Sequence, residues 1–368
     1  MGNCSRLLVL IALILPLVPA APLSAQHAAA SPWQMQTSNT TAGLRGIHAV
    51  NSKIAWASGT NGTVLRTTDG GQHWQRCATP PDAAKLDFRS IWAWDANTAM
   101  VMSSGPGALS RLYKTTDACK HWRLVYTNPD KSGFWDDISF SGDYPLPPRM
   151  GELLGDPVGG YFTIFDSEDN GDTWHRVVDP GLRSLPDEGL FAASNSSLSA
   201  DWDDGIQFFG TGGPLGPRLF YNCDPCLRAA VFTASPMPLF PKGKSAGIFS
   251  IAYRYVPVGQ RFLHIIIAVG GDYTKPNDPT GTAAWSSDGG RTWHAATHPP
   301  HGYRSAVAWD PSPKAWIAAG TNGSDVSYDD GKTWRPLDNG NWNALSLSWV
   351  VGPSGRIARL DSHLLPTP

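Results

Sequence analysis

The sequence is poor in charged residues and shows no sustained helical periodicity. Of its 368 residues only 16% are charged, the net charge is −2, and no run of basic residues occurs. A nearly neutral chain without a basic patch predicts no affinity for nucleic acid. No stretch beyond residue 30 repeats apolar residues at a spacing of 3.6, which argues against a helical fold. The abundant residues are instead 16 Trp, 38 Gly and 31 Pro, a composition typical of short strands joined by turns.

One short pattern, [ST]-x-D-x-G-x-[TH]-W, recurs five times along the chain. Four copies are complete, and the copy at residues 115–122 has Cys119 in place of the glycine. The aspartate and tryptophan of the successive copies are Asp69 and Trp74, Asp117 and Trp122, Asp169 and Trp174, Asp288 and Trp293, and Asp329 and Trp334.

Each position of the pattern has a structural role in a tight hairpin. The Asp side chain can accept hydrogen bonds from nearby backbone N–H groups, and the Gly supplies the positive φ that such a turn requires. The Trp opens the next strand and buries a large ring. Catalysis or metal binding is the alternative role for these aspartates. Because the turns repeat at the outside of the fold and do not converge, we expect the structural role.

The spacing of the pattern predicts the architecture. Successive tryptophans are 48, 52, 119 and 41 residues apart, so the long interval should contain one more unit with a degenerate turn, for which residues 222–229 are the candidate. A further unit without the pattern follows at the C-terminus, and residues 31–36 resemble its missing last strand. The sequence therefore predicts an all-β fold, a single seven-bladed β-propeller of residues 31–368 whose last blade is closed by the N-terminal strand.

The N-terminal residues have the features of a secretory signal peptide. A short basic start precedes the apolar run LLVLIALILPLV, and the small residues of PAAPLSA follow. We expect residues 1–25 to be the signal peptide and residues 26–30 a short linker, which predicts an exported protein, periplasmic or extracellular. The apolar run is too short for a transmembrane span, although a retained anchor is the alternative.

Four cysteines remain once the signal peptide is set aside. An even number in an exported chain favours disulfides, although the sequence leaves their pairing open. Cys223 and Cys226 lie in the degenerate turn, where a disulfide between them could replace the lost Gly and Trp. A redox or metal site is the alternative, but this Cys-x-x-Cys lacks a second pair of ligands. We therefore predict neither a metal nor a cofactor.

The innermost strands of the blades should surround one opening, where a propeller can bind a ligand. Aligning these strands places Arg45, Arg89 and Arg304 at equivalent positions, with Asp136 at the same place in the third blade. Guanidinium groups present planar donor pairs to carboxylates, so the mouth could bind an anion or a peptide. The alternative is that Arg45 and Arg89 pair with Asp87, Asp136 or Asp137 to neutralise charges in a wet channel.

The repeated pattern resembles that of the BNR or Asp-box propellers over the whole mature chain. Within that group the sequence is most similar to the photosystem II stability/assembly factor family, in a bacterial subgroup found outside phototrophs. The similarity lies in turns of the TTDGGxxW form, in the R-[SG]-I start of inner strands at Arg45 and Arg89, and in the segments EGLFAAS, GTGGP, AGIFSIAYR and VGGDYTKP. Such a resemblance implies a single exported propeller, whereas the box alone says little about function.

Sialidases also resemble this chain in the boxes and in an arginine triad, but their Arg-Ile-Pro motif is missing here. Their chemistry needs a Tyr nucleophile, a Glu and an acidic Asp, for which Tyr303, Glu188 and Asp136 could be proposed. We expect instead a non-catalytic, monomeric module of the cell envelope that binds a protein or peptide partner or assists assembly. A glycoside hydrolase is the alternative.

Overall fold

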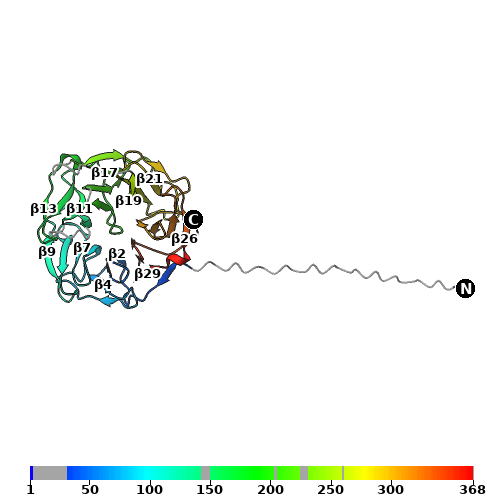
Figure 1. The fold of residues 1–368 in the computed structure, drawn as a ribbon, viewed down its shortest axis with the longest axis horizontal. Helices are drawn as coiled ribbons and strands as arrows, with labels where there is room; N and C mark the ends of the chain where they lie inside the picture. The colour runs from blue at the N-terminus through cyan, green and yellow to red at the C-terminus, as the bar shows by residue number, and fades with distance from the viewer. Residues whose placement is uncertain (3–30, 142–149, 203–204, 224–230, 259–260, 368) are drawn as a thin grey trace. The chain divides into compact units, whose positions relative to one another are not determined.

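The protein folds as a ring of seven antiparallel sheets, the blades. In this computed structural model the described residues are 1–2, 31–141, 150–202, 205–223, 231–258 and 261–367. Residues Ser31–Pro368 form one compact unit, in which six blades have four strands and the fifth has five. In Figure 1 the blades follow one another around a common centre in chain order, from blue to red. The predicted seven-bladed propeller is thereby confirmed.

The first three blades have four strands each, ordered from the centre outward, and each carries one copy of the repeated turn pattern. Blade 1 consists of β2 (Leu44–Ala49), β3 (Ala55–Gly59), β4 (Thr63–Thr67) and β5 (Gln75–Arg76). Blade 2 consists of β6 (Phe88–Ala93), β7 (Ala99–Ser103), β8 (Arg111–Thr115) and β9 (Arg123–Thr127). Blade 3 consists of β10 (Trp135–Phe140), β11 (Gly151–Val158), β12 (Tyr161–Ser167) and β13 (His175–Arg176).

The next three blades continue the ring with greater variation in strand length. Blade 4 consists of β14 (Leu198–Asp201), β15 (Ile206–Gly210), β17 (Arg218–Cys223) and β18 (Thr233–Pro236). Blade 5 consists of β16 (Gly212–Gly213), β19 (Gly243–Val258), β20 (Arg261–Asp272), β21 (Ala283–Ser286) and β22 (His294–Ala295). Blade 6 consists of β23 (Ala306–Asp310), β24 (Ala315–Gly320), β25 (Gly323–Ser327) and β26 (Arg335–Asp338).

Blade 7 joins the two ends of the propeller, as the sequence predicted. Its strands are β27 (Ala344–Ser346), β28 (Trp349–Val351), β29 (Ile357–Leu360) and, at the outer edge, β1 (Trp33–Met35). Trp33 of β1 pairs with Leu360 of β29 in antiparallel register. The N-terminal strand thus completes a four-stranded last blade and closes the ring.

Gln36, directly after β1, links blade 7 to blade 1. Its Oε1 accepts hydrogen bonds of 3.0 Å from Nε1 of Trp74 in blade 1 and from Nε1 of Trp349 in blade 7. Its Nε2 donates to the Gly70 carbonyl at 3.0 Å. Gly71 makes room for this amide, because a Cβ at that position would lie 2.1 Å from Gln36 Oε1. One side chain therefore satisfies polar groups of both the first and the last blade.

The repeated turns are held together by the side chains of the pattern. In the first copy Asp69 Oδ1 accepts from the His73 backbone N–H at 3.0 Å, and Thr67 Oγ1 accepts from the Gly71 N–H at 2.9 Å. The bond from the His73 backbone, together with the His73 ring, lowers the pKa of Asp69 to about 2. Trp74 then packs its ring into the core. The side chains of this turn are thus occupied in holding the hairpin.

A disulfide joins blade 1 to blade 2 and accounts for the cysteine in the second turn. Cys77 follows β5, and its sulfur is bonded to that of Cys119 across a sequence separation of 42 residues. Cys119 has φ 61°, in the region where Gly71 of the first copy has φ 85°. The residue that replaces the glycine of the pattern thus joins two blades covalently.

Two predictions fall on residues that are not described. The degenerate turn and the proposed Cys223–Cys226 disulfide lie largely within residues 224–230, outside the described residues. The signal peptide and linker, residues 1–30, lie outside them too, apart from the first two residues.

Among the described residues, seven clusters of buried apolar side chains fill the spaces between adjacent blades. One of them unites Trp74 of blade 1 with Trp349 of blade 7, so the core continues across the seam. Three short 3₁₀ helices occur in the described ranges, at Gly107–Leu109, Pro180–Leu182 and Ser362–Leu364. Within those ranges, no helix combines the length and the apolar character needed to cross a membrane.

Candidate functional site

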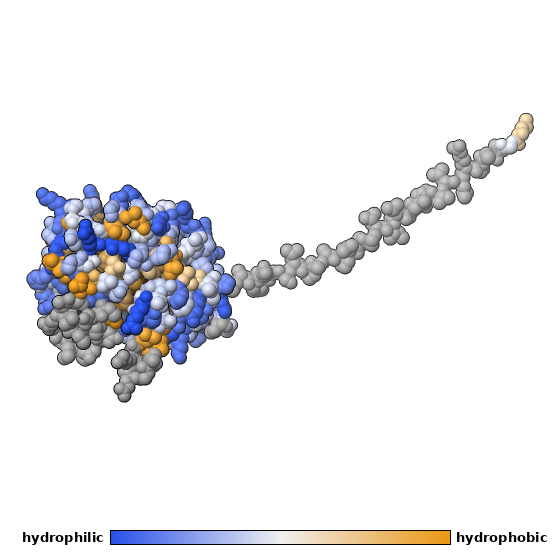
Figure 2. Space-filling view, turned by 90° about the horizontal axis from the view of Figure 1, so that it is seen from above, coloured by the Kyte–Doolittle hydropathy of each residue, from blue (hydrophilic) through white to orange (hydrophobic). Residues whose placement is uncertain are grey.

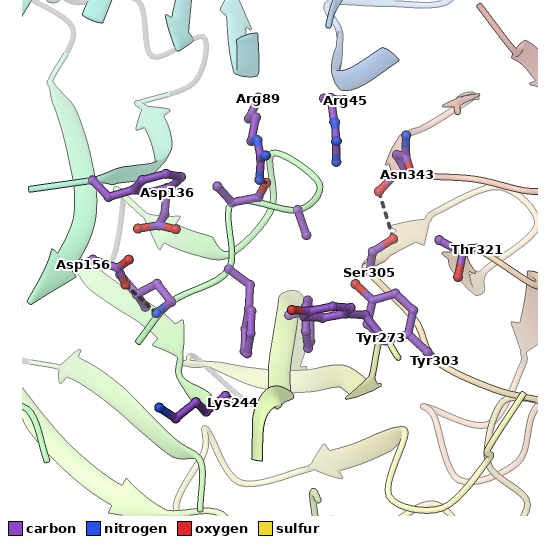
Figure 3. A pocket seen from close by; sticks show the side chains of 16 residues that line it. Arg45, Arg89, Asp136, Asp156, Lys244, Tyr273, Tyr303, Ser305, Thr321 and Asn343 are labelled. Carbon is purple, nitrogen blue, oxygen red and sulfur yellow. Dashed lines mark hydrogen bonds between the residues drawn. The ribbon is translucent and has the colours of Figure 1, made fainter. Parts of the chain in front are cut away.

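A cavity of about 490 Å³ opens at the mouth of the channel. Figure 3 shows Arg45 and Arg89 on one wall, Asp136 and Asp156 on the next, and Tyr303 with its neighbours facing the arginines. Three of the four predicted binding residues, Arg45, Arg89 and Asp136, line this cavity.

β-Bulges position these side chains. Arg45 is the extra residue between Leu44, which pairs with Gly59, and Gly46, which pairs with Ser58. The same irregularity occurs at Arg89, Asp136 and Phe249 in the inner strands of blades 2, 3 and 5. A bulged residue leaves the alternation of the strand and is re-aimed, here toward the channel.

Arg304 lies elsewhere, because the predicted alignment of its strand is out of register by one residue. The backbone N–H of Leu44 donates to Gly352 of the preceding blade, and the N–H of Arg304 donates to Gly270 of its preceding blade. Arg304 is thus equivalent to the buried Leu44, and Ser305 is equivalent to Arg45. Consistent with this assignment, Ser305 lines the cavity and Arg304 does not.

Arg304 is fully buried in a network of polar groups. Its Nε donates to Asp325 Oδ2 at 2.6 Å, and its Nη1 donates to the Tyr303 carbonyl at 2.6 Å and to Asn322 Oδ1. His301 Nδ1 lies 2.8 Å from the other oxygen of Asp325. A buried guanidinium that is paired in this way has a structural role rather than a ligand-binding one.

Arg45 and Arg89 share the carboxylate of Asp87. The Nε of Arg89 lies 2.9 Å from Asp87 Oδ2, and the Nε of Arg45 lies 3.8 Å from Oδ1. The two arginine side chains are 34% and 28% exposed. Of the partners considered from the sequence, Asp87 is the one that the structure provides. One carboxylate for two guanidinium groups leaves a net positive wall facing the cavity.

The floor of the cavity is a segment that precedes blade 4, residues Leu190–Ser197, here called the crossing segment. The Ala192 carbonyl accepts from Arg89 Nη1 at 3.3 Å, on the side of blade 2. The Ser196 carbonyl accepts from the Ile251 N–H of blade 5 at 3.3 Å. The segment therefore crosses the ring from blade 2 to blade 5, and its first four residues line the cavity.

Asp136 and Asp156 form an acidic wall next to the arginines. Asp136 is 2% exposed, and its Oδ2 has no hydrogen-bond partner among the described residues. Burial raises the pKa of Asp136 well above its ordinary value, and the carboxyl groups of Asp156 and Asp137 raise it further. Asp156 Oδ1 accepts from the Leu190 N–H at 2.8 Å, and burial raises the pKa of Asp156 as well.

The neighbouring Asp137 is fully bonded. Its Oδ1 accepts from Ser90 Oγ at 2.8 Å, and its Oδ2 accepts from the Leu198 N–H at 3.0 Å. Asp137 thereby ties blade 3 to blades 2 and 4. Burial raises its pKa to about 6, although these hydrogen bonds act in the opposite direction.

Aromatic rings form the remaining wall. Phe191 of the crossing segment stacks on Phe249 with ring centroids 3.8 Å apart, and Tyr303 meets Phe249 edge to face at 4.8 Å. Tyr273 is 51% exposed at the rim. The cavity thus combines cationic, acidic and aromatic surfaces, a mixture that suits a peptide better than a purely apolar ligand.

The residues considered for sialidase chemistry do not meet in the cavity. Glu188 is buried beside Arg218, whose Nε lies 2.9 Å from Glu188 Oε1, and Thr211 Oγ1 donates to the same oxygen at 2.7 Å. Burial raises the pKa of Tyr303, which opposes its ionisation as a nucleophile. Tyr303 and Asp136 line the cavity, whereas Glu188 does not.

Several residues that line the cavity were not predicted from the sequence as binding residues. The sequence suggests that the runs GELLGDP and VGGDYTKP connect strands, but Asp156 of the first run lies in β11, and Tyr273 of the second directly follows β20. The EGLFAAS run contains most of the crossing segment. For Tyr273 and the crossing segment the available signal was their place between strands, because binding residues often lie in connections. Among the described residues, no group of three or more His, Cys, Asp or Glu side chains is arranged to hold a metal ion.

The seven blades and the repeated turns define the class of the protein as a BNR-repeat β-propeller. A family model described as "Photosynthesis system II assembly factor YCF48" matches residues 25–188, so this part of the chain is similar to that family. No curated protein matches the sequence.

Solved structures share the fold. "YCF48 bound to D1 peptide" is 16% identical, with a TM-score of 0.59 over 90% of this chain and 97% of that one. "YCF48 from Cyanidioschyzon merolae" is 17% identical, with a TM-score of 0.59 over 91% and 100%. The WD40 propeller domain of Doa1 is 11% identical, with a TM-score of 0.52 over 92% and 100%.

Proposed function

We propose that this protein is an exported, non-catalytic propeller that binds a protein segment at the channel mouth and assists assembly in the cell envelope. The observation that carries the proposal is the wall made by Arg45 and Arg89. Both arginines share Asp87 and remain about one-third exposed toward a cavity of about 490 Å³. Their free donors suit a carboxylate of the partner, either a side chain or a C-terminus.

The comparisons support a peptide as the partner. A propeller of similar fold carries the description "YCF48 bound to D1 peptide". The match to the model of an assembly factor supports a role in assembly, although the partner of this chain can differ from that of the assembly factor.

Export and a monomeric state are parts of the same proposal. The basic start, apolar run and small residues of the N-terminus support export, as does the disulfide between Cys77 and Cys119. On the face drawn in Figure 2, hydrophobic side chains lie in patches interrupted by hydrophilic ones. That pattern supports a monomer, because large continuous apolar patches mark stable interfaces.

A pull-down from envelope extract tests the proposal. The mature protein is compared with an Arg45→Ala, Arg89→Ala variant and with an Arg76→Ala, Arg291→Ala control, which removes two exposed arginines outside the cavity. We expect a partner that the wild type and the control retain and the cavity variant loses. A partner retained equally by all three, or by none, contradicts binding at this mouth.

A glycoside hydrolase is the second candidate, favoured by the paired carboxyl groups of Asp136 and Asp156. Burial raises the pKa of both, which is a property of a general acid, and many glycosidases use two such groups. Hydrolysis of a panel of aryl glycosides that disappears in Asp136→Asn would favour this candidate over the binding module.

A further inference from the structure

The acidic wall of the cavity carries an inference about the ligand. Asp136 and Asp137 are adjacent and both buried, yet only Asp137 has a full set of hydrogen bonds. The Oδ2 atom of Asp136 has no partner among the described residues. Figure 3 shows the Asp136 carboxyl group directed into the cavity beside that of Asp156. Burying a polar atom without a hydrogen bond costs free energy, and a ligand that donates a hydrogen bond to the atom would remove that cost.

Within the described part of the chain, the basic side chains that line the cavity form no ion pairs with Asp136 or Asp156. Arg45 and Arg89 form their ion pairs with Asp87, and no ion pair among the described residues joins either of them to Asp136 or Asp156. Lys244 also lines the cavity but is exposed, and it makes no ion pair with these two carboxyl groups.

Two carboxyl groups in one buried position repel each other once both are ionised. The carboxyl of Asp156 contributes to the raised pKa of Asp136, next to the larger effect of burial. A cation placed between them would offset that repulsion and favour the ionised forms. Ammonium and guanidinium groups also donate several hydrogen bonds each, one of which could go to Asp136 Oδ2.

We propose that Asp136 and Asp156 form a subsite for a cationic group of the bound peptide, a lysine ammonium, an arginine guanidinium or a free N-terminus. The inference rests on the proposed function and adds to it that the ligand is dipolar. Its carboxylate meets Arg45 and Arg89, and its cation meets the acidic wall. The aromatic rings of Phe249 and Tyr303 lie along the remaining side of the cavity.

The test uses two pools of random octapeptides with free C-terminal carboxylates, one with acetylated N-termini and one with free N-termini. Each pool is passed over the immobilised mature protein, and the retained peptides are sequenced by mass spectrometry. We expect Lys and Arg to be enriched about tenfold in the retained acetylated peptides, since a charge-assisted pair is worth about that factor. Better retention of the free N-terminus pool would identify the terminal ammonium as the source.

Matched variants locate the effect. Asp136→Asn and Asp156→Asn, on separate strands, keep the side-chain shape and should each remove most of the preference for cations. Asp82→Asn, at an exposed turn outside the cavity, removes the same charge and should leave the preference unchanged. Circular dichroism and thermal melting of each variant show whether it is folded, and either Asp variant suffices if the other fails to fold.

The outcomes separate the two proposals. If both pools are retained but neither Lys, Arg nor a free N-terminus improves retention, the acidic subsite is wrong and the peptide-binding function stands. The subsite is also wrong if the preference persists in Asp136→Asn and Asp156→Asn. If neither pool is retained above background, the peptide-binding function itself fails.

Discussion

Arg45, the second residue of β2, and Arg304, two residues before β23, stand in similar sequence contexts, but their environments are opposite. Arg45 occupies a β-bulge, is about one-third exposed and faces the cavity. Arg304 occupies the preceding structural position, where blade 1 has a leucine, and is fully buried against Asp325. A shift of one residue in register separates an arginine that faces the cavity from a buried structural one, because the bulge takes residue 45 out of the alternation of its strand.

The largest effect that should distinguish the two arginines is on stability. Arg304→Ala leaves the buried Asp325 without its cationic partner, and we expect a loss of about 3–5 kcal/mol in the free energy of unfolding. Arg45→Ala removes a partly exposed, solvent-screened pair and should cost less than about 1 kcal/mol. Urea unfolding followed by tryptophan fluorescence measures both. Equal losses would contradict the different roles assigned here.

The disulfide provides the next test, because it fastens the two blades that carry Arg45 and Arg89. Replacing Cys77 and Cys119 by serine removes a cross-link over 42 residues and should cost about 2–4 kcal/mol. Retention of the acetylated octapeptide pool should persist under conditions where the variant is folded. A parallel loss of peptide retention would show that the link shapes the cavity as well as stabilising the fold.

Adding an arginine at position 305, next to Arg304, tests the assignment of the register. Ser305→Arg places a guanidinium at the position equivalent to Arg45, and it should raise affinity for an acetylated peptide with a free carboxylate by about tenfold. The lost hydrogen bond from Ser305 Oγ to the Asn343 carbonyl should cost about 1 kcal/mol in stability. Isothermal titration and urea unfolding check the two effects. Destabilisation as large as that of Arg304→Ala would mean that position 305 does not face the cavity.

The smallest effect is on pH dependence, and its sign differs between two aspartates. Burial raises the folded-state pKa of Asp136, so its contribution to stability is present below the unfolded pKa and is lost as pH rises through the folded one. The unfolding free energy of wild type minus that of Asp136→Asn should therefore fall with rising pH. Arg89 faces Asp136 and opposes the shift, while Asp137 and Asp156 add to it.

Asp69 provides the opposite case. The backbone hydrogen bond from His73 lowers its folded pKa to about 2, so its contribution is present above the unfolded pKa and is lost as pH falls toward 2. The difference between wild type and Asp69→Asn should therefore shrink with falling pH. Thermal melting of both variants across pH 2–8 checks the two signs, and parallel curves would contradict the assignment.

The repeats made the fold predictable, since each turn pattern marks one blade and the interval lengths reveal the missing ones. Alignment of the inner strands led to Arg45, Arg89 and Asp136, because in blades 1 to 3 the bulged residue stands two positions before an isoleucine. Arg304 could not be placed in the same way. A bulge adds one residue without leaving a mark in the sequence, so the alignment of blade 6 was one residue out of register.

Other features depend on contacts that spacing does not encode. The Cys77–Cys119 bond requires the edge of one blade to approach the turn of the next, and the pairing of four cysteines cannot be derived from their order. Asp156 enters the cavity because the crossing segment folds across the centre and donates to it through Leu190. The position of Asp156 in the cavity therefore depends on the three-dimensional arrangement of the blades, which the spacing of the repeats does not give.

The glutamine after the first strand also has a consequence for the order of folding. Gln36 accepts a hydrogen bond from Trp349, which is 313 residues away in the sequence. A contact of such separation carries a large loop-closure entropy, so we expect it to form after the local hairpins of the other blades. Blades 1 to 6 can therefore assemble from neighbouring segments as the chain lengthens. Strand β1, although it is made first, can pair only after β29 has been made, so closure of the ring is expected to be the last step of folding.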